Sequence, residues 1–245
     1  QTIYAYISDG GIQEEISQGA GRVAGHLGLD NLIMYYDANN IQLSTKVDEV
    51  DSEDVAAKYR AWGWKVLSID GCDSDAIRAA LTEAKATVGQ PTLIIGRTIM
   101  GRGAVAADGS SFEDKVSTHG QPLSAAGADF AATVRHLGGD PEDPFRIFPD
   151  VQALYDARLS ELRQLAAARR EEEARWAVEN PDRAAKLERW FGGAAPSIDW
   201  SQVEQKPNQA TRAASATVLS VLATQVENMI VASADLSNSD KTDGF

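Results

Sequence analysis

Hydrophobic and polar positions along the chain follow two alternating patterns. Apolar runs with β-branched and aromatic content, typical of buried strands, occupy residues 2–7, 32–36, 65–69 and 92–95. Apolar residues at three- and four-residue steps, which predict helices, occupy residues 12–27, 54–62 and 74–88. Strands that alternate with helices predict an α/β fold with a doubly wound parallel sheet and right-handed crossovers. A turn is expected after the first strand, from Ser8 to Gly11.

The pattern changes after the fourth predicted strand. Residues 101–119 are rich in Gly, Ser and Asp, which predicts a long loop of the functional or mobile kind. Residues 151–191 are charge-rich and helical, with a break near Pro181, and are expected to form a solvated connector. A linker, a further helix and a short strand are then predicted at 196–207, 211–225 and 229–232.

Composition and charge narrow the range of functions. The 245 residues are 43% hydrophobic and 24% charged, typical of a soluble globular chain of one or two domains. A net charge of −13 disfavours partners such as nucleic acid or an anionic membrane surface. No apolar run reaches bilayer length and no signal peptide is evident, so we expect a cytoplasmic protein. The lone Cys72 offers neither a disulfide nor a zinc site.

Two polar residues follow the first two predicted strands. Asp9 and Asn39 should both lie at the carboxyl edge of the sheet, where open α/β sheets bind ligands. A carboxylate, an amide oxygen, the Ile41 carbonyl, two diphosphate oxygens and a water would complete the six ligands of Mg²⁺. Gly10 and Gly11 would allow phosphates to approach the backbone. Taken singly, Asp-Gly is also an ordinary turn, and Asn-Asn is common at left-handed positions.

These residues carry a family resemblance. Ser8-Asp9-Gly10, followed by Asn39-Asn40, resembles the thiamine diphosphate motif, which begins Gly-Asp-Gly and ends in asparagine. The order and spacing of further segments are similar to transketolase: Gln13 to Ser17, Ala24 to Leu27, Asn31 to Ile33, Glu53 to Ala56, Gly63-Trp64, Pro91 to Ile94, His119-Gly120, Pro122-Leu123, Ala210 to Arg212 and Ser233 to Leu236. The resemblance covers essentially the whole chain.

The resemblance implies thiamine diphosphate and Mg²⁺, or Ca²⁺ in its place, as cofactors. It implies that Asp9, Asn39 and the Ile41 carbonyl bind the metal, and that the backbone at Ser8 and Gly10 meets the diphosphate. The residues expected to line the cofactor are Leu43, Met100 and Gly101.

The resemblance also implies roles for chemically versatile residues. His119 would contact the diphosphate and the reacting substrate, where a near-neutral pKa permits proton transfer. Glu14 would join a carboxylate network across a dimer interface, although a solvated first-turn glutamate is the alternative. Arg212 and Ser239 would bind the sugar phosphate, and Asp235 the cofactor across the interface. A helix-surface arginine is the alternative for Arg212.

As a member of this family, the chain is expected to divide into three parts: residues 1–145 as an N-terminally truncated diphosphate-binding domain, 146–207 as helical connector and linker, and 208–245 as the start of a pyrimidine-binding α/β domain. The implied reaction transfers a two-carbon ketol unit from a ketose phosphate to an aldose phosphate, as in the pentose phosphate pathway. The implied partners are sugar-phosphate substrates and a second copy of the chain, in a homodimer with the active site at the subunit interface.

Two residues depart from the family pattern. Ser8 replaces the usual first glycine and would be strained at positive φ, and Arg102 stands where an aromatic residue is common. The family's upstream histidines, and the downstream glutamate that activates the cofactor, have no counterpart in these 245 residues. We therefore expect this chain alone not to catalyse ketol transfer.

Two rival interpretations remain at this point. Another thiamine diphosphate family, deoxyxylulose phosphate synthase or the first subunit of pyruvate dehydrogenase, would share the motif, but the segments at Gln13 to Ser17 and His119-Gly120 argue against both. A non-catalytic module for metal and diphosphate, or one subunit of a split enzyme, is the alternative outside catalysis.

Overall fold

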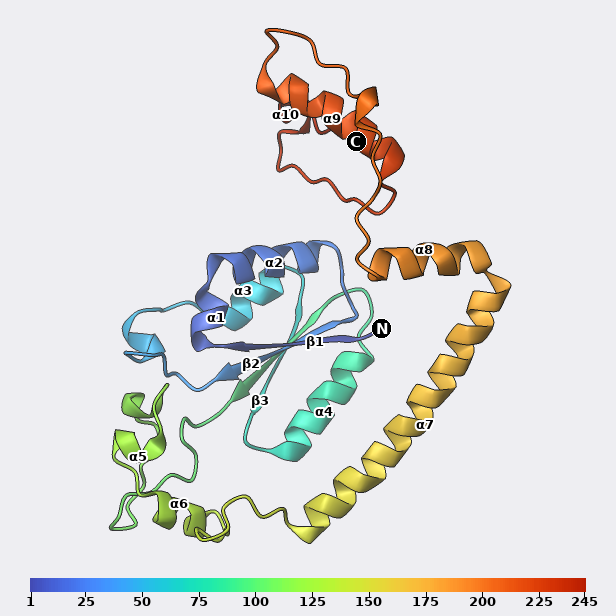
Figure 1. The fold of residues 1–245 in the computed structure, drawn as a ribbon. Coiled ribbons are helices and arrows are strands. Elements are labelled where there is room, and N and C mark those ends of the chain that lie inside the picture. Colours follow the sequence, from blue (N-terminus) through green and yellow to red (C-terminus); the bar gives the residue numbers. More distant parts are fainter. The chain divides into compact units, whose positions relative to one another are not determined.

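The computed structural model describes residues 1–245. Its internal contacts divide the chain into two compact units, Gln1–Ile147 and Phe148–Phe245. The first unit holds the only sheet, and the second is helical (Figure 1). The three-part division expected from the sequence stays a prediction.

The sheet has four parallel strands in the order β1-β2-β4-β3. The strands are β1 (Ile3–Ser8), β2 (Leu32–Ala38), β3 (Lys65–Asp70) and β4 (Thr92–Arg97). In the register, Ser8 lies opposite Asp37, and Asp37 lies opposite Gly96, so the carboxyl ends of three strands meet at one edge. The predicted α/β class with a parallel sheet is confirmed.

Helices cover both faces of the sheet (Figure 1), which makes it doubly wound as predicted. Four helices belong to these layers: α1 (Asp9–Gln13), α2 (Glu15–His26), α3 (Val55–Ala61) and α4 (Ser74–Lys85). The core on the α2 and α3 face contains Ile12, Ala24, Met34, Tyr36, Tyr59, Trp64, Leu93 and Ile95. The core on the α4 face contains Ile33, Ala80, Ala84 and Ile94. Strands β2 and β4 are therefore apolar on both faces, which explains their uninterrupted hydrophobic runs.

The first helix differs from the prediction. Helix α1 begins at Asp9, where a turn was expected, and the helical run breaks at Glu14, whose backbone is extended with φ −64° and ψ 132°. Side-chain amides compensate at the break: Gln13 Nε2 donates to the Asp9 carbonyl at 3.1 Å, and Gln18 Nε2 donates to the Gln13 carbonyl at 2.9 Å. These bonds satisfy carbonyls near the helix ends, so the chain can bend there.

Short elements complete the first unit. They are the 3₁₀ turns η1 (Val47–Glu49) and η2 (Val116–Thr118) and the helices α5 (Leu123–Ala126) and α6 (Phe130–His136). The predicted long loop at 101–119 contains only η2 and an isolated antiparallel bridge between Val105 and Ser111. Both α5 and α6 are too short to produce a helical repeat that the sequence pattern would reveal.

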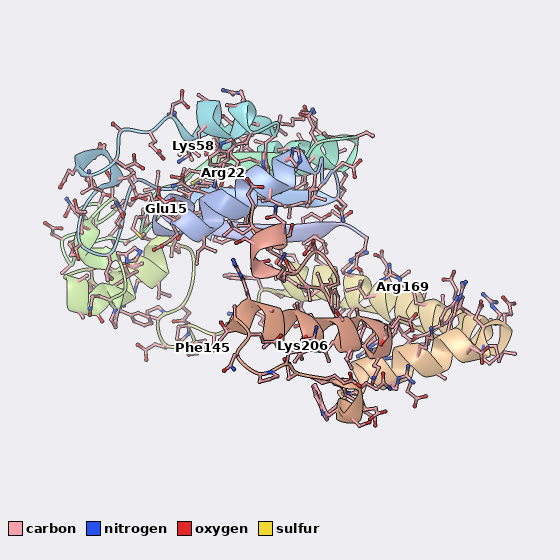
Figure 2. All side chains as sticks on the ribbon, turned by 90° about the horizontal axis from the view of Figure 1, so that it is seen from above. Glu15, Arg22, Lys58, Phe145, Arg169 and Lys206 are labelled. Carbon is pink, nitrogen blue, oxygen red and sulfur yellow. The ribbon has the colours of Figure 1, made fainter.

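The second unit contains the long helix α7 (Pro149–Glu179), α8 (Pro181–Phe191), η3 (Trp200–Gln202), α9 (Thr211–Gln225) and α10 (Ser237–Asp240). The predicted break at Pro181 is confirmed, because proline begins α8. Helix α7, which carries the Arg169 labelled in Figure 2, has no buried residue. None of the helices combines the length and the apolar character that a membrane crossing requires.

The short strand predicted at residues 229–232 is wrong. These residues form no strand, and the second unit contains no strand at all. A strand is stabilised by hydrogen bonds to a neighbouring strand, so an isolated β-branched segment has no ladder to join.

Candidate functional site

Polar residues gather where β1, β2 and β4 end. Asp9 follows β1 and is only 2% exposed, an unusual burial for a carboxylate. A cavity of about 330 Å³ opens beside it. The residues that line this cavity are Asp9, Tyr36, Ala38, Asn39, Asn40, Val47, Arg97 and Thr98.

Strand β2 and the turn after it hold the Asp9 carboxylate. The Tyr36 hydroxyl donates to Asp9 Oδ1 at 2.6 Å, and the Asn39 backbone N–H donates to Oδ2 at 3.2 Å. Asn39 Oδ1 in turn accepts from the Ile41 N–H at 3.0 Å. Asn40 has φ 64°, a left-handed conformation that asparagine adopts more readily than most residues. The predicted convergence of Asp9 and Asn39 is therefore present.

Burial and hydrogen bonds together shift the pKa values of the groups at this edge. Burial raises the pKa of Asp9 above its ordinary value, more than the hydrogen bonds from Tyr36 and Asn39 lower it. Burial, together with the bond to Asp9, also raises the pKa of Tyr36 above its usual range, so Tyr36 remains a neutral donor. Asp37, the next residue of β2, accepts from the Tyr6 hydroxyl at 2.5 Å and from the Thr98 hydroxyl. The hydrogen bond to Asp37 is the largest cause that raises the pKa of Tyr6 to about 12.

The loop after β4 brings the two neighbours of His119 in the chain, Thr118 and Gly120, close to Gly101 and Leu43. A Cβ added to Gly120 would lie 3.2 Å from Leu43 Cδ1, and one added to Gly101 would lie 3.7 Å from Thr118. The His119 ring nitrogen Nδ1 is buried and has no hydrogen-bond partner. A buried imidazole nitrogen without a partner is costly, so it marks a position where a ligand or a water would be stabilising.

In the second unit, Arg212 contacts Ser239. Arg212 Nη1 lies 3.4 Å from both the Ser239 carbonyl and its Oγ, although the two residues are far apart in sequence. Asp235 is exposed, and in the first unit Glu14 is exposed at the break between α1 and α2. Neither carboxylate makes an ion pair or a side-chain hydrogen bond, so the structure leaves their predicted roles open.

Both departures from the family pattern are accommodated locally. Ser8 has φ −102° and ψ 176°, an extended conformation without the strain that a positive φ would cause. Arg102 Nη1 donates to the Cys72 carbonyl at 3.1 Å, which ties the loop to the turn after β3.

Sequence reasoning missed Tyr36, Arg97 and Thr98 as lining residues of the cavity. Arg97 and Thr98 follow the apolar run of the fourth strand after Gly96, and the position of polar residues after a strand is the same signal that identified Asp9 and Asn39. Tyr36 belongs to an apolar run, and nothing in the sequence distinguishes it from a core tyrosine.

The donor set fits a hard cation bound together with an anion. No group of three or more His, Cys, Asp or Glu side chains comes together in the structure. The carboxylate of Asp9 and the amide oxygen of Asn39 at this cavity instead match part of the oxygen set that Mg²⁺ takes when phosphate oxygens supply much of the rest. A bound cation would stabilise the ionised form of the buried Asp9 carboxylate, which burial disfavours.

Comparisons with known proteins agree with this geometry. The family profile described as "Transketolase, thiamine diphosphate binding domain" matches residues 1–196. The chain belongs to the transketolase family. The rival thiamine diphosphate families considered from the sequence are not needed to explain the motif.

Similar proteins cover almost the whole chain. It is 36% identical to Transketolase 2 of Xanthobacter flavus and 32% identical to the transketolase of Scheffersomyces stipitis, over 98% of this chain and 35% of each relative. Among solved structures, the transketolase from Leishmania mexicana matches with a TM-score of 0.85 and 30% identity over 99% of this chain and 36% of that chain. The transketolase from Campylobacter jejuni matches with a TM-score of 0.79 and 31% identity, covering 36% of that chain. The chain thus spans about a third of the length of these relatives.

Proposed function

We propose that this chain carries the half-site of a transketolase that holds a divalent metal and the diphosphate of thiamine diphosphate. The observation that carries the proposal is the convergence of a buried Asp9 with Asn39 beside a cavity at the carboxyl edge of the sheet. The enzyme that contains this half-site transfers a two-carbon ketol unit from a ketose phosphate to an aldose phosphate, the pentose phosphate reaction.

In this proposal Asp9, Asn39 and the Ile41 carbonyl bind Mg²⁺ or Ca²⁺. Asp9 is fixed by two donors, and the Asn39 side chain is fixed by the Ile41 N–H, so the oxygens are held before the metal arrives. Such preorganisation lowers the conformational cost of binding. It supports a metal role over an ordinary turn aspartate, which would be exposed.

The diphosphate would lie against the backbone at Ser8 and Gly10. A Cβ added at Gly10 would meet nothing within 4 Å, so the space above this backbone is open. Arg97, the only basic residue that lines the cavity, could offset the charge of the diphosphate against the net charge of −13. Leu43, Met100 and Gly101 would line the cofactor.

His119 is proposed to contact the diphosphate and the reacting sugar. Its buried and unpartnered Nδ1 supports this role, because a bound group would supply the missing hydrogen bond. Arg212 and Ser239 are proposed to bind the sugar phosphate, and their mutual contact at 3.4 Å supports a shared function. Glu14 and Asp235 are proposed to act across a homodimer interface, and their exposure leaves them free to do so.

When bound, thiamine diphosphate supplies the nucleophilic carbon that accepts the ketol unit. The contribution of this chain is to hold the cofactor, to orient the sugar phosphate and to move protons through His119. A homodimer and a cytoplasmic location belong to the same proposal.

The half-site can be tested by calorimetric titration of thiamine diphosphate with and without Mg²⁺, on the protein at the full length that its gene encodes. Asp9→Ala should weaken the Mg²⁺-dependent binding by more than tenfold, or about 1.4 kcal/mol at the least. Asp75→Ala removes the same charge from an exposed position on α4 and should leave the affinity unchanged. Equal affinities for wild type and Asp9→Ala would refute the metal assignment.

A further inference from the structure

We propose that Tyr36 is a positioning residue that sets the orientation of the Asp9 carboxylate for the metal without touching the metal. This inference rests on the proposed function and extends it to a residue outside the ligand set. Its basis is the buried hydrogen bond of 2.6 Å between the Tyr36 hydroxyl and Asp9 Oδ1.

Two donors, one in β2 and one in the turn that follows it, each bind a different oxygen of the Asp9 carboxylate. Tyr36 occupies a lone pair of Oδ1, and the Asn39 N–H occupies a lone pair of Oδ2. An ionised carboxylate has about four lone-pair sites, so each oxygen keeps about one for another partner. The carboxylate cannot rotate about its own axis without breaking both bonds, and its remaining lone pairs therefore keep a fixed direction.

The tyrosine itself is immobile. Tyr36 is 6% exposed, and its ring belongs to the core that includes Ile12 and Leu93. Close-packed interiors leave such a ring little freedom. Tyr36 thus holds Asp9 Oδ1 in place from a side chain that is packed in the core. The other donor, the Asn39 N–H, belongs to the turn that follows β2.

The identity of the cation provides a test that a general loss of stability would not mimic. Mg²⁺ requires nearly ideal octahedral geometry, whereas Ca²⁺ accepts variable geometry and more ligands. A carboxylate that can rotate should therefore bind Mg²⁺ much less well and Ca²⁺ only slightly less well. A purely structural role for Tyr36 would lower the affinity for both ions alike.

The chain offers a matched control. Tyr59 is also fully buried in the same core, at 0% exposure, but its hydroxyl has no hydrogen-bond partner. Tyr36→Phe and Tyr59→Phe each remove one buried hydroxyl and keep the ring. Only the first breaks a bond to Asp9.

The experiment measures the half-saturating concentrations of Mg²⁺ and of Ca²⁺ at fixed thiamine diphosphate, by calorimetry on the full-length protein without substrate. Outer-shell partners of metal ligands typically contribute 10- to 100-fold to affinity, so Tyr36→Phe should raise the Mg²⁺ value at least about tenfold. The Ca²⁺ value should rise less, and Tyr59→Phe should change neither. When Asp9→Ala is already present, adding Tyr36→Phe should cause no further loss of Mg²⁺ affinity.

Three results would overturn the inference. The first is an unchanged Mg²⁺ value in Tyr36→Phe, and the second is an equal rise for Mg²⁺ and Ca²⁺. The third is that the wild type binds thiamine diphosphate without any dependence on metal. Only this third result would also overturn the proposed function. Circular dichroism melts verify folding, and Tyr36→Met, which fills the core position without a hydroxyl, repeats the test if the phenylalanine variant does not fold.

Discussion

Gly25 on α2 packs against the backbone of another element so closely that it admits no side chain. A Cβ built there would lie 1.9 Å from the Trp62 carbonyl oxygen, 2.9 Å from the Trp62 carbonyl carbon and 3.1 Å from Trp64 Cδ1. The first of these atoms belongs to the backbone and cannot rotate away. Gly25→Ala therefore tests whether this close approach of α2 to the turn after α3 holds the first unit together.

The cost can be worked from the distances. Ordinary carbon–oxygen contacts lie near 3.3 Å, so the helix and the turn would have to separate by roughly 1.4 Å. Overpacking of a close-packed interior costs about 1 to 3 kcal/mol, and a backbone clash belongs at the upper end. The same movement would strain the hydrogen bond of 2.8 Å from Trp64 Nε1 to the Gly21 carbonyl, worth about 1 kcal/mol. The higher helix propensity of alanine offsets about 1 kcal/mol of this cost. The free energy of unfolding should therefore fall by about 3 kcal/mol in Gly25→Ala.

Gly19 supplies the control on the same helix. A Cβ at Gly19 would meet nothing within 4 Å, so Gly19→Ala should stabilise the protein by about 0.5 to 1 kcal/mol through helix propensity alone. Urea unfolding followed by circular dichroism measures both variants. Hydrogen exchange of residues 15–26 localises the effect to α2. If Gly25→Ala proved as stable as wild type, or if both variants shifted in the same direction, the packing argument would be wrong.

Two further predictions concern single side chains. Arg212→Ala should raise the Michaelis constant for phosphorylated sugars much more than for unphosphorylated ones, because only the former lose an ionic partner, and equal effects in steady-state kinetics would make Arg212 structural. Burial raises the pKa of Tyr59 to about 12, so the folded state holds this proton more tightly than the unfolded state does. The free energy of unfolding therefore falls as the pH rises from about 10 to 12. In Tyr59→Phe this fall should be smaller by about 1 kcal/mol at pH 11. Urea unfolding of wild type and variant at pH 8 and pH 11 measures it, and the same pH dependence in wild type and variant would contradict the prediction.

Much of the first unit could be predicted from local pattern. Residue periodicity reports which faces of an element are buried, so the runs of β2 and β4 and the repeat of α4 are visible in the sequence. The carboxyl-edge position of Asp9 and Asn39 follows from the strand ends and the parallel arrangement. The family resemblance could also be identified from the sequence, because it rests on the order and spacing of short motifs along the chain.

Contacts between distant residues could not be predicted in this way. The strand order β1-β2-β4-β3 and the bond of Tyr36 to Asp9 depend on which surfaces meet in space, and periodicity carries no record of the partner. The same limit applies to the contact of Arg212 with Ser239, which are 27 residues apart in the sequence. The predicted strand at residues 229–232 failed for the same reason, since local propensity describes a strand but the hydrogen bonds that stabilise it come from a neighbour.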